Sequence, residues 1–511
     1  MRSSRLFAVL PTLLTLGVLS GVPSLAHADA PHRYRVAVDA GMSRMWVEAR
    51  FSAPVDSVTA QSNEAGQFLL DVRDCDDASS DASDNSTIRL RNRRMMLPAG
   101  GIHCMNYSVD LASAAASVPH NQSLAPENVV VSPALWLWRP RLTRDSEIRI
   151  EFDLPGEMQV AVPWQRLERD RQSFLLGDSP ESSSAPAVFG TFEYSEIDVP
   201  GATLRVSVLR GSERTQGGMD DASIKEWLRT TATGISLAYG RFPNPSPQIV
   251  VIPVADGRRG ESAVPFGRVI RDGGEAIELF VDRRQPLEAF LGDWTATHEF
   301  SHLMLPYVEP RHRWISEGFA QYYQNVLLAR SGTYDPQTAW QKLYDGLERG
   351  RQSRPELSPN EATAGDTRNG RMKIYWSGAA IALMADVALR ERSGGEMTLD
   401  DVMGQLQACC LPSDQTWSGP ELFATLDTLT GAPVFMPLYR RYADTSGFPD
   451  TRPLFERLGI AVEDDKIRIR RSGELQHIRS AITQWDDATV ARRGQPAGMA
   501  HRNAAGSAGS R

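Results

Sequence analysis

Two histidines and a glutamate stand together in the segment His298-Glu299-Phe300-Ser301-His302. Residues four positions apart on a helix lie on the same face, so both imidazoles can reach a single ion. Glu299 is offset by one position, which leaves it close to a water at the metal without making it a ligand. A catalytic zinc takes three protein ligands and leaves a fourth position for water. The segment therefore indicates zinc chemistry with Glu299 as general base, if a third ligand exists; otherwise it is a helix with two surface histidines.

Glu317 is the candidate for the third ligand. It follows His302 by fifteen positions, and the loop between them is long enough to bring two helices together antiparallel. Gly318, directly after it, weakens a helix by roughly 1 kcal/mol. We expect this glycine to let the two helices approach closely at the metal. The alternative for Glu317 is a solvated acid at a helix start, where the helix dipole favours it.

A site completed by a third histidine is excluded by the spacing. That arrangement has the pattern HExxHxxGxxH, but Leu305 and Val308 stand at the positions of its glycine and its third histidine. His312 is out of register, and we interpret it as a loop histidine. The remaining histidines have no spacing typical of metal ligands.

Two predicted helices position these side chains. The first begins near Pro286 and ends at Leu305, before Pro306; the second runs over 314–330 and ends at Gly332. Alternation and turn residues predict the strands, and apolar periodicity predicts the other helices. Strands are expected at 35–39, 45–51, 146–152, 203–209, 249–254 and 275–282, a lone edge strand at 466–471, and helices at 223–239, 377–392, 399–408, 419–429 and 437–442.

The chain has 511 residues, too many for a single hydrophobic core, and its residue pattern changes along its length from strand-like to helix-like. We expect an α+β protein with an N-terminal β-rich, sandwich-like domain over 31–200. A zinc-binding α/β domain over 201–332 and a C-terminal helical domain over 333–486 follow. The remainder, 487–511, is rich in Ala, Gly, Arg and Ser and is expected to be a disordered tail.

Residues 1–28 have the features of a secretory signal peptide. Arg2 and Arg5 form a basic start, an apolar run follows over 6–22, and Ala26-His27-Ala28 offers small residues for cleavage. A membrane anchor is the alternative, but the run is short and contains prolines and glycines. No later stretch looks apolar enough to span a bilayer. We therefore expect an exported protein, periplasmic or secreted.

Charge and cysteine content fit such a protein. The formal net charge of −8 becomes −10 when the two arginines of 1–28 are removed, which argues against nucleic acid or anionic lipid as main partner. The four cysteines suit an oxidising compartment. We favour a Cys75–Cys104 disulfide, because both lie in the β-rich region and close a modest loop. The adjacent Cys409 and Cys410 form either a vicinal disulfide or a pair of buried thiols.

Several segments resemble the gluzincin peptidases, and most closely the glycyl aminopeptidase family. WISEGFAQYY, over 314–323, is similar to the family's WxxEGxxxYY segment. YWSG, over 375–378, resembles its YxKG helix, and TLDDVM, over 398–403, its SLDDVM-like segment. The resemblance covers about 200–460, without the PDZ domain that many members carry. It implies a thermolysin-like catalytic domain and one zinc ion.

The resemblance also assigns roles to single residues. His298, His302 and Glu317 match the family's zinc ligands, and Glu299 matches its base. Tyr375 matches the tyrosine whose hydroxyl donates to the oxyanion. The family's lysine in YxKG is Ser377 here.

A separate glutamate holds the substrate's free amine in related aminopeptidases. It stands on a strand roughly two dozen residues before HExxH, in a Gly-x-Met-Glu-Asn or Gly-Gly-Leu-Glu-His type segment. Glu275 is the candidate here, although Ala276 follows it, and its alternative is an exposed strand-entry acid. Glu261 is a weaker candidate. Ser316 and Gln321 are candidates for orienting a histidine ligand.

The sequence thus predicts an exported zinc-dependent peptidase that acts on peptide or protein substrates. It leaves aminopeptidase and endopeptidase activity both open. The alternative is a catalytically silent peptide-binding or assembly protein on a gluzincin scaffold, which the departures at Ser377 and Ala276 keep open.

Overall fold

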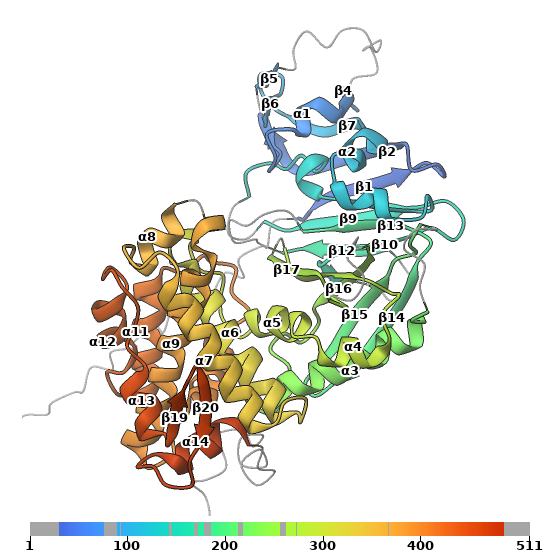
Figure 1. The fold of residues 1–511 in the computed structure, drawn as a ribbon. Helices are drawn as coiled ribbons and strands as arrows, with labels where there is room; N and C mark the ends of the chain where they lie inside the picture. Colours follow the sequence, from blue (N-terminus) through green and yellow to red (C-terminus); the bar gives the residue numbers. More distant parts are fainter. Residues whose placement is uncertain are drawn as a thin grey trace, which may run out of the picture.

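The computed structural model describes residues 30–484 apart from short gaps. The gaps are 76–88, 92, 143–145, 168–171, 178–184, 213–217, 256–261, 272 and 366. The predicted signal peptide, the predicted tail from 487 and Glu261 lie outside the described residues. Figure 1 shows an α+β arrangement, with the β-rich N-terminal part at one end and the helical C-terminal part at the other.

The β-rich part is built from three sheets. The largest has the strand order β11-β12-β9-β1-β2-β7-β4, the second β10-β13-β8, and the third β3-β6-β5. Their strands are β1 (His32–Val38), β2 (Arg44–Val55), β3 (Ser57–Thr59), β4 (Leu69–Asp74), β5 (Arg89–Arg91), β6 (Arg94–Met96), β7 (Ile102–Asp110), β8 (Asn128–Val131), β9 (Ile148–Asp153), β10 (Gln159–Ala161), β11 (Gln165–Arg166), β12 (Ser173–Leu176) and β13 (Ala187–Gly190). Short helices α1 (Ala65–Phe68) and α2 (Leu111–Ala116) and two 3-10 turns (Pro119–Ser123 and Pro133–Leu135) connect them.

One hydrophobic core joins the seven-stranded sheet to the sheet β10-β13-β8. Ile150 and Phe174 of the first sheet and Phe189 of the second belong to one buried cluster, which agrees with the sandwich-like expectation. A disulfide links Cys75 to Cys104 across neighbouring strands, as we predicted.

A five-stranded sheet follows, in the order β14-β15-β16-β18-β17. Its strands are β14 (Glu193–Val199), β15 (Ala202–Val208), β16 (Gln248–Pro253), β17 (Phe266–Arg271) and β18 (Glu275–Val281), with helix α3 (Asp221–Ser236) between β15 and β16. Strands β15, β16 and β18 are parallel, and their buried runs match the strand predictions. The edge strand β17 pairs antiparallel with β18 and was not predicted.

The single helix predicted from Pro286 to Leu305 is wrong. The structure has two helices, α4 (Leu287–Gly292) and α5 (Thr295–His302), separated by the extended residue Asp293. The Asp293 carboxylate accepts hydrogen bonds from the Thr295 backbone N–H (2.8 Å) and from the Ser262 hydroxyl (2.6 Å). The helix is therefore interrupted because Asp293 bonds both to the loop residue Ser262 and to the first residue of α5.

The C-terminal part is a helical assembly around one long helix. Its helices are α6 (Arg313–Arg330), α7 (Pro336–Gln352), α8 (Pro359–Ala364), α9 (Thr367–Ser393), α10 (Leu399–Cys410), α11 (Gly419–Thr430), α12 (Phe435–Tyr442), α13 (Arg452–Arg457) and α14 (Gln476–Thr483). A 3-10 turn (Pro310–His312) precedes α6. The predictions found α6, α9, α10, α11 and α12 but missed α7, α8, α13 and α14. The neighbouring Cys409 and Cys410 form a vicinal disulfide at the end of α10.

Helices α6 and α9 cross in close contact at two glycines. A Cβ added to Gly318 would lie 2.2 Å from the Gly378 Cα, and one added to Gly378 would lie 2.0 Å from the Trp314 carbonyl oxygen. We expected Gly318 to bring α6 close to the HExxH helix. The structure corrects this: the glycine lets α6 approach α9, because Gly318 faces Gly378.

Buried charges fix the same helices on the other side of the crossing. Tyr322 donates a hydrogen bond to Asp386 of α9 (2.7 Å), and Tyr323 donates one to Asp400 of α10 (3.2 Å). Arg330 pairs with Asp400 at 3.0 Å, and Arg390 pairs with Asp386 at 2.9 Å. The family-like tyrosine pair therefore serves helix packing.

Two further expectations need correction. We expected no segment after the signal peptide to be apolar enough to span a membrane, but among the described residues one helix, over Gly370–Ser393, is long and apolar enough. Inside the protein, 78% of its most apolar window is buried, which is typical of a core helix. The strand expected alone at 466–471 is paired. It is β20 (Lys466–Ile469), which forms a hairpin with β19 (Ile460–Glu463) and accepts a hydrogen bond from Gln337 of α7.

Replacing Gly318 by alanine should destabilise the protein. The added methyl group has no room against the α9 backbone, and overpacking of this kind costs about 1–3 kcal/mol. Gly292→Ala is the matched control, because a Cβ there meets nothing within 4 Å. Urea denaturation of both variants measures the difference, and equal stability of the two would contradict the tight crossing.

Candidate metal centre

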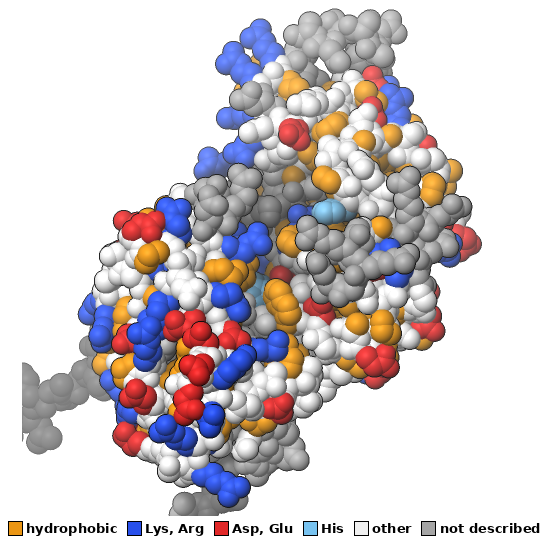
Figure 2. All heavy atoms as spheres, in the orientation of Figure 1, with side chains coloured by type: hydrophobic (Ala, Val, Ile, Leu, Met, Phe, Trp, Pro, Cys, Tyr) orange, Lys and Arg blue, Asp and Glu red, His pale blue; other side chains and the backbone are white. Residues whose placement is uncertain are grey.

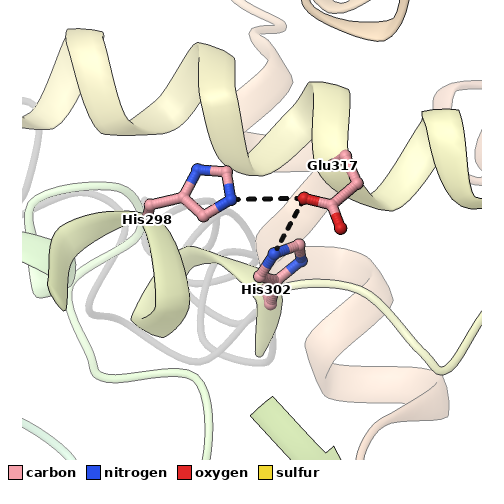
Figure 3. A group of neighbouring side chains, drawn as sticks. All are labelled: His298, His302 and Glu317. Carbon is pink, nitrogen blue, oxygen red and sulfur yellow. Dashed lines mark hydrogen bonds and ion pairs between the residues drawn. The ribbon is translucent and has the colours of Figure 1, made fainter. Parts of the chain in front are cut away.

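His298, His302 and Glu317 converge from two helices. Figure 3 shows both imidazoles of α5 pointing toward the glutamate carboxylate of α6. The Glu317 Oε2 atom lies 3.3 Å from His298 Nε2 and 3.5 Å from His302 Nε2. One ligand atom from each residue falls within 4.8 Å of the others. The structure thus brings together the three residues that the sequence predicted as ligands.

This donor set fits zinc. Zinc binds histidine nitrogen and carboxylate oxygen at about 2.0–2.2 Å in tetrahedral sites, which places neighbouring ligand atoms about 3.3 Å apart. The two distances to Glu317 Oε2 agree with that spacing. His298 and Glu317 are buried, whereas His302 is partly exposed toward a cavity. The arrangement provides three protein ligands with an open side.

Arg313 orients the glutamate ligand. It lies one helical turn before Glu317, and its Nε and Nη2 atoms both contact Glu317 Oε1, at 2.8 and 2.7 Å. The arginine therefore holds one carboxylate oxygen and leaves Oε2 facing the histidines. Burial works to raise the pKa of Glu317, but His302 and His298 hold it well below its ordinary value. The carboxylate is thus charged.

The histidines have different supporting partners. His302 Nδ1 lies 3.0 Å from the Ser316 hydroxyl, so Ser316 contacts the ligand that we predicted it to orient. The described contacts give the Gln321 side chain no such bond. Instead Gln324 lies beside His298: burial works to lower the pKa of that histidine, whereas Glu317 and Gln324 act to raise it. Gln324 is therefore the residue whose position the sequence prediction missed.

Glu299 lies against the edge strand. A Cβ added to Gly267 of β17 would sit 2.6 Å from Glu299 Cγ, so only glycine leaves room for this side chain. Burial raises the pKa of Glu299 against the opposing influence of His298 and His302. A carboxylate whose pKa is raised toward neutrality is suited to exchange protons with substrate.

Tyr375 lies on the other side of His298. The two rings stack with centroids 5.6 Å apart and an interplanar angle of 10°. Burial raises the pKa of Tyr375, and the negative charge of Glu317 raises it further. The phenol therefore keeps its proton and can donate a hydrogen bond.

A cavity of about 430 Å³ gathers these groups. Glu299, His302, Glu317 and Tyr375 line it, together with the whole of β17. Figure 2 shows the surface hollowed where the helical part meets the sheets. The cavity holds the predicted base, the predicted oxyanion donor and two of the predicted ligands.

Glu275 is not in this cavity, which corrects its predicted amine-binding position. It lines a neighbouring cavity, where its Oε1 accepts a hydrogen bond from Arg271 Nε (3.1 Å) and its Oε2 one from Asn244 (2.6 Å). The preceding Gly273 and Gly274 belong to the turn between β17 and β18, packed against Pro163 and Leu176. These glycines therefore serve a close contact with the β-rich part.

His312 is a structural histidine, in agreement with its interpretation as a non-ligand. It is buried, its Nδ1 accepts a hydrogen bond from the Gly419 backbone (3.0 Å), and its Nε2 lies 3.0 Å from the Tyr439 hydroxyl.

Besides Gln324, sequence reasoning missed two parts of the site. Arg313 stands four positions before Glu317, which is the helical spacing of an ion pair and was a readable signal. The edge strand β17 was harder to find. Its segment FGRVIR has little alternation, and only its position beside the HExxH helix gives it importance.

The segment that carries half of this site matches a known family. The sequence model described as M61 glycyl aminopeptidase matches residues 306–380, which include Glu317 and Tyr375. This chain is a metallopeptidase that resembles the glycyl aminopeptidases. The match to residues 306–380 is shorter than the resemblance over about 200–460 that we described from the sequence. No curated protein matches it in sequence.

Solved structures share the fold at low sequence identity. An aminopeptidase N family protein from Idiomarina loihiensis is 14% identical, with a TM-score of 0.60, over 84% of this chain and 79% of that one. An M1 zinc metallopeptidase from Deinococcus radiodurans is 12% identical, with a TM-score of 0.48, over 82% of this chain and 94% of that one. At 14% identity, the likeness to the Idiomarina loihiensis protein concerns the fold alone.

Replacing Ser316 by alanine should weaken zinc binding about 10- to 100-fold, because the His302 ring loses the partner that orients it. Gln321→Ala, on the same helix, should bind zinc like the parent protein. Competition with a chromophoric chelator measures both affinities. Equal affinities for the two variants would show that Ser316 has no orienting role.

Proposed function

We propose that this metallopeptidase hydrolyses peptide bonds with one zinc ion held by His298, His302 and Glu317. The observation that carries the proposal is the convergence of these ligand atoms within 4.8 Å, beside a cavity lined by Glu299 and Tyr375. When bound, zinc supplies Lewis acidity, which polarises a carbonyl oxygen and acidifies water. The remaining chemistry belongs to the protein's own side chains.

Glu299 is the general base in this proposal. It takes a proton from the attacking water and later gives it to the leaving amine. Its buried position against Gly267 limits its movement, and its raised pKa makes it a stronger base for the first of these two transfers. The carbonyl oxygen gains negative charge during the attack. Tyr375 donates a hydrogen bond to that oxygen. Its stacking on the His298 ring and its raised pKa, which keeps the phenol protonated, support this role.

We also propose that the protein is exported. The proposal is supported by the basic and apolar N-terminus of the sequence and by the two disulfides, which form readily in an oxidising compartment. N-terminal sequencing of the mature protein tests it. A start near position 29 supports export, and retention of residues 1–28 contradicts cleavage.

Replacing Glu299 by glutamine should keep the zinc and lower kcat about 100- to 10,000-fold, because the amide cannot accept the proton. Glu288→Gln, an exposed acid on α4, is the control and should retain activity. Metal analysis and peptide hydrolysis assays measure the two properties. Full activity of Glu299→Gln would contradict the mechanism. A zinc-loaded parent protein that hydrolyses no peptide would favour the catalytically silent alternative.

Replacing Tyr375 by phenylalanine should lower kcat about 100- to 1000-fold while KM changes little, because the hydroxyl acts on the charge that develops during the reaction. Tyr344→Phe on α7 is the matched control, since this tyrosine lies outside the metal cavity. Steady-state kinetics on one peptide compare the variants. A rise in KM without loss of kcat would assign Tyr375 to substrate binding instead.

A further inference from the structure

A second, larger cavity adjoins the metal cavity. It has a volume of about 890 Å³, at the upper end of the range for ligand sites. Five parts of the chain line it: the β-rich part around Gln165, strands β14 and β15, the loop around Ser246 before β16, the turn between β17 and β18, and the loop around Ser413 that follows α10. None of the predicted catalytic or ligand residues lies in it.

Arg271 is the residue that the two cavities share. It is the last residue of β17, and its side chain is only 9% exposed. Its Nη2 atom donates to the carbonyl oxygens of His302 (3.2 Å) and Leu305 (2.9 Å), while its Nε donates to Glu275 (3.1 Å). Arg271 is therefore a firmly held residue that lines both cavities, and it lies at one end of the edge strand.

Strand β17 offers an unpaired edge to a substrate. Among the described residues it stands last in its sheet and pairs only with β18, and all six of its residues line the metal cavity. An extended peptide adds to such an edge through main-chain hydrogen bonds. Antiparallel pairing is the more stable of the two directions. A peptide bound in that direction runs from the Arg271 end of the strand toward the Phe266 end.

This direction determines which part of the substrate meets the larger cavity. Gly267 lies against Glu299, so the bond to be cleaved lies near the Phe266 end of the strand. The residues before that bond extend past Arg271 and reach the larger cavity. A substrate with a single residue before the cleaved bond leaves that space unused.

The charges at the boundary do not favour a free amine. Among the described residues that line the metal cavity, the acids are Glu299 and Glu317, which the proposed mechanism uses. Glu275, on the far side of Arg271, has both carboxylate oxygens occupied by Arg271 and Asn244. An ammonium group in the metal cavity would therefore meet no described carboxylate that is left for it.

We propose that the larger cavity binds the stretch of a peptide substrate that precedes the cleaved bond, so that the enzyme acts as an endopeptidase. The inference rests on the proposed peptidase function. It assigns a binding site for three or more substrate residues to the walls around Gln165, Ser246 and Asp414. Cleavage then depends on substrate length before the bond and not on a free N-terminal amine.

Two series of fluorogenic peptides test the proposal on the full zinc-loaded protein. Both share one cleavable pair of residues. The first series is lengthened by one to four residues before the pair, each with a free and an acetylated N-terminus; the second is lengthened after it. We expect kcat/KM to rise at least about tenfold along the first series and to be unchanged by acetylation. A preference for one free N-terminal residue, or a gain confined to the second series, would overturn the proposal.

A variant that fills the cavity ties the effect to this site. Ser246 is exposed and lines the larger cavity, so Ser246→Trp should reduce the gain from lengthening the first series. Thr230→Trp, on an exposed position of α3, is the matched control and should keep the full gain. An undiminished gain in Ser246→Trp would contradict the assignment. If the zinc-loaded protein hydrolyses no peptide of either series, the proposed peptidase function itself fails. If it hydrolyses peptides of all lengths at equal rates, the peptidase function stands and only the proposal for the larger cavity fails.

Discussion

The close crossing of helices α6 and α9 is the constraint on which the candidate site depends. Gly318 and Gly378 allow the two backbones to touch, and larger side chains at either position have no room. Glu317 precedes the first glycine, and Tyr375 stands one helical turn before the second. The crossing therefore sets the ligand carboxylate and the phenol on either side of His298. Buried ion pairs behind it, such as Arg330 with Asp400, hold the helices in this position, because a buried charge left unpaired is strongly destabilising.

Each reactive group in the site has a neighbour that limits its orientation. Arg313 holds one oxygen of Glu317, the Ser316 hydroxyl contacts His302, and the backbone at Gly267 confines Glu299. Such supporting contacts matter because a metal ligand must keep its geometry to within a fraction of an ångström. Two of these three contacts come from the first turn of α6. A single helix start thus provides a ligand and its supports.

The chemistry and the choice of substrate are carried by different parts of the chain. The segment that matches the glycyl aminopeptidase model, 306–380, contains Glu317 and Tyr375. The edge strand and all the residues that line the larger cavity lie outside it. A shared metal site therefore does not determine which end of a peptide is recognised. In this molecule the Glu275 carboxylate accepts a hydrogen bond from Arg271 and lines the larger cavity, outside the metal cavity.

The sequence by itself determined the candidate ligand set, because His298 and His302 follow a local helical spacing and Glu317 stands in the first turns of the next helix. It also determined seven of the twenty strands that the structure describes and the helices with strong apolar periodicity, since these patterns arise from local geometry and burial. Other features depended on distant contacts. Asp293 interrupts the helix before the site because it bonds to Ser262, and Gly318 faces α9, not the HExxH helix. Only the tertiary structure decided that Glu275 lines the neighbouring cavity and not the metal cavity. Its neighbours Arg271 and Asn244 come together through sheet and loop packing, which leaves no periodic signal in the sequence.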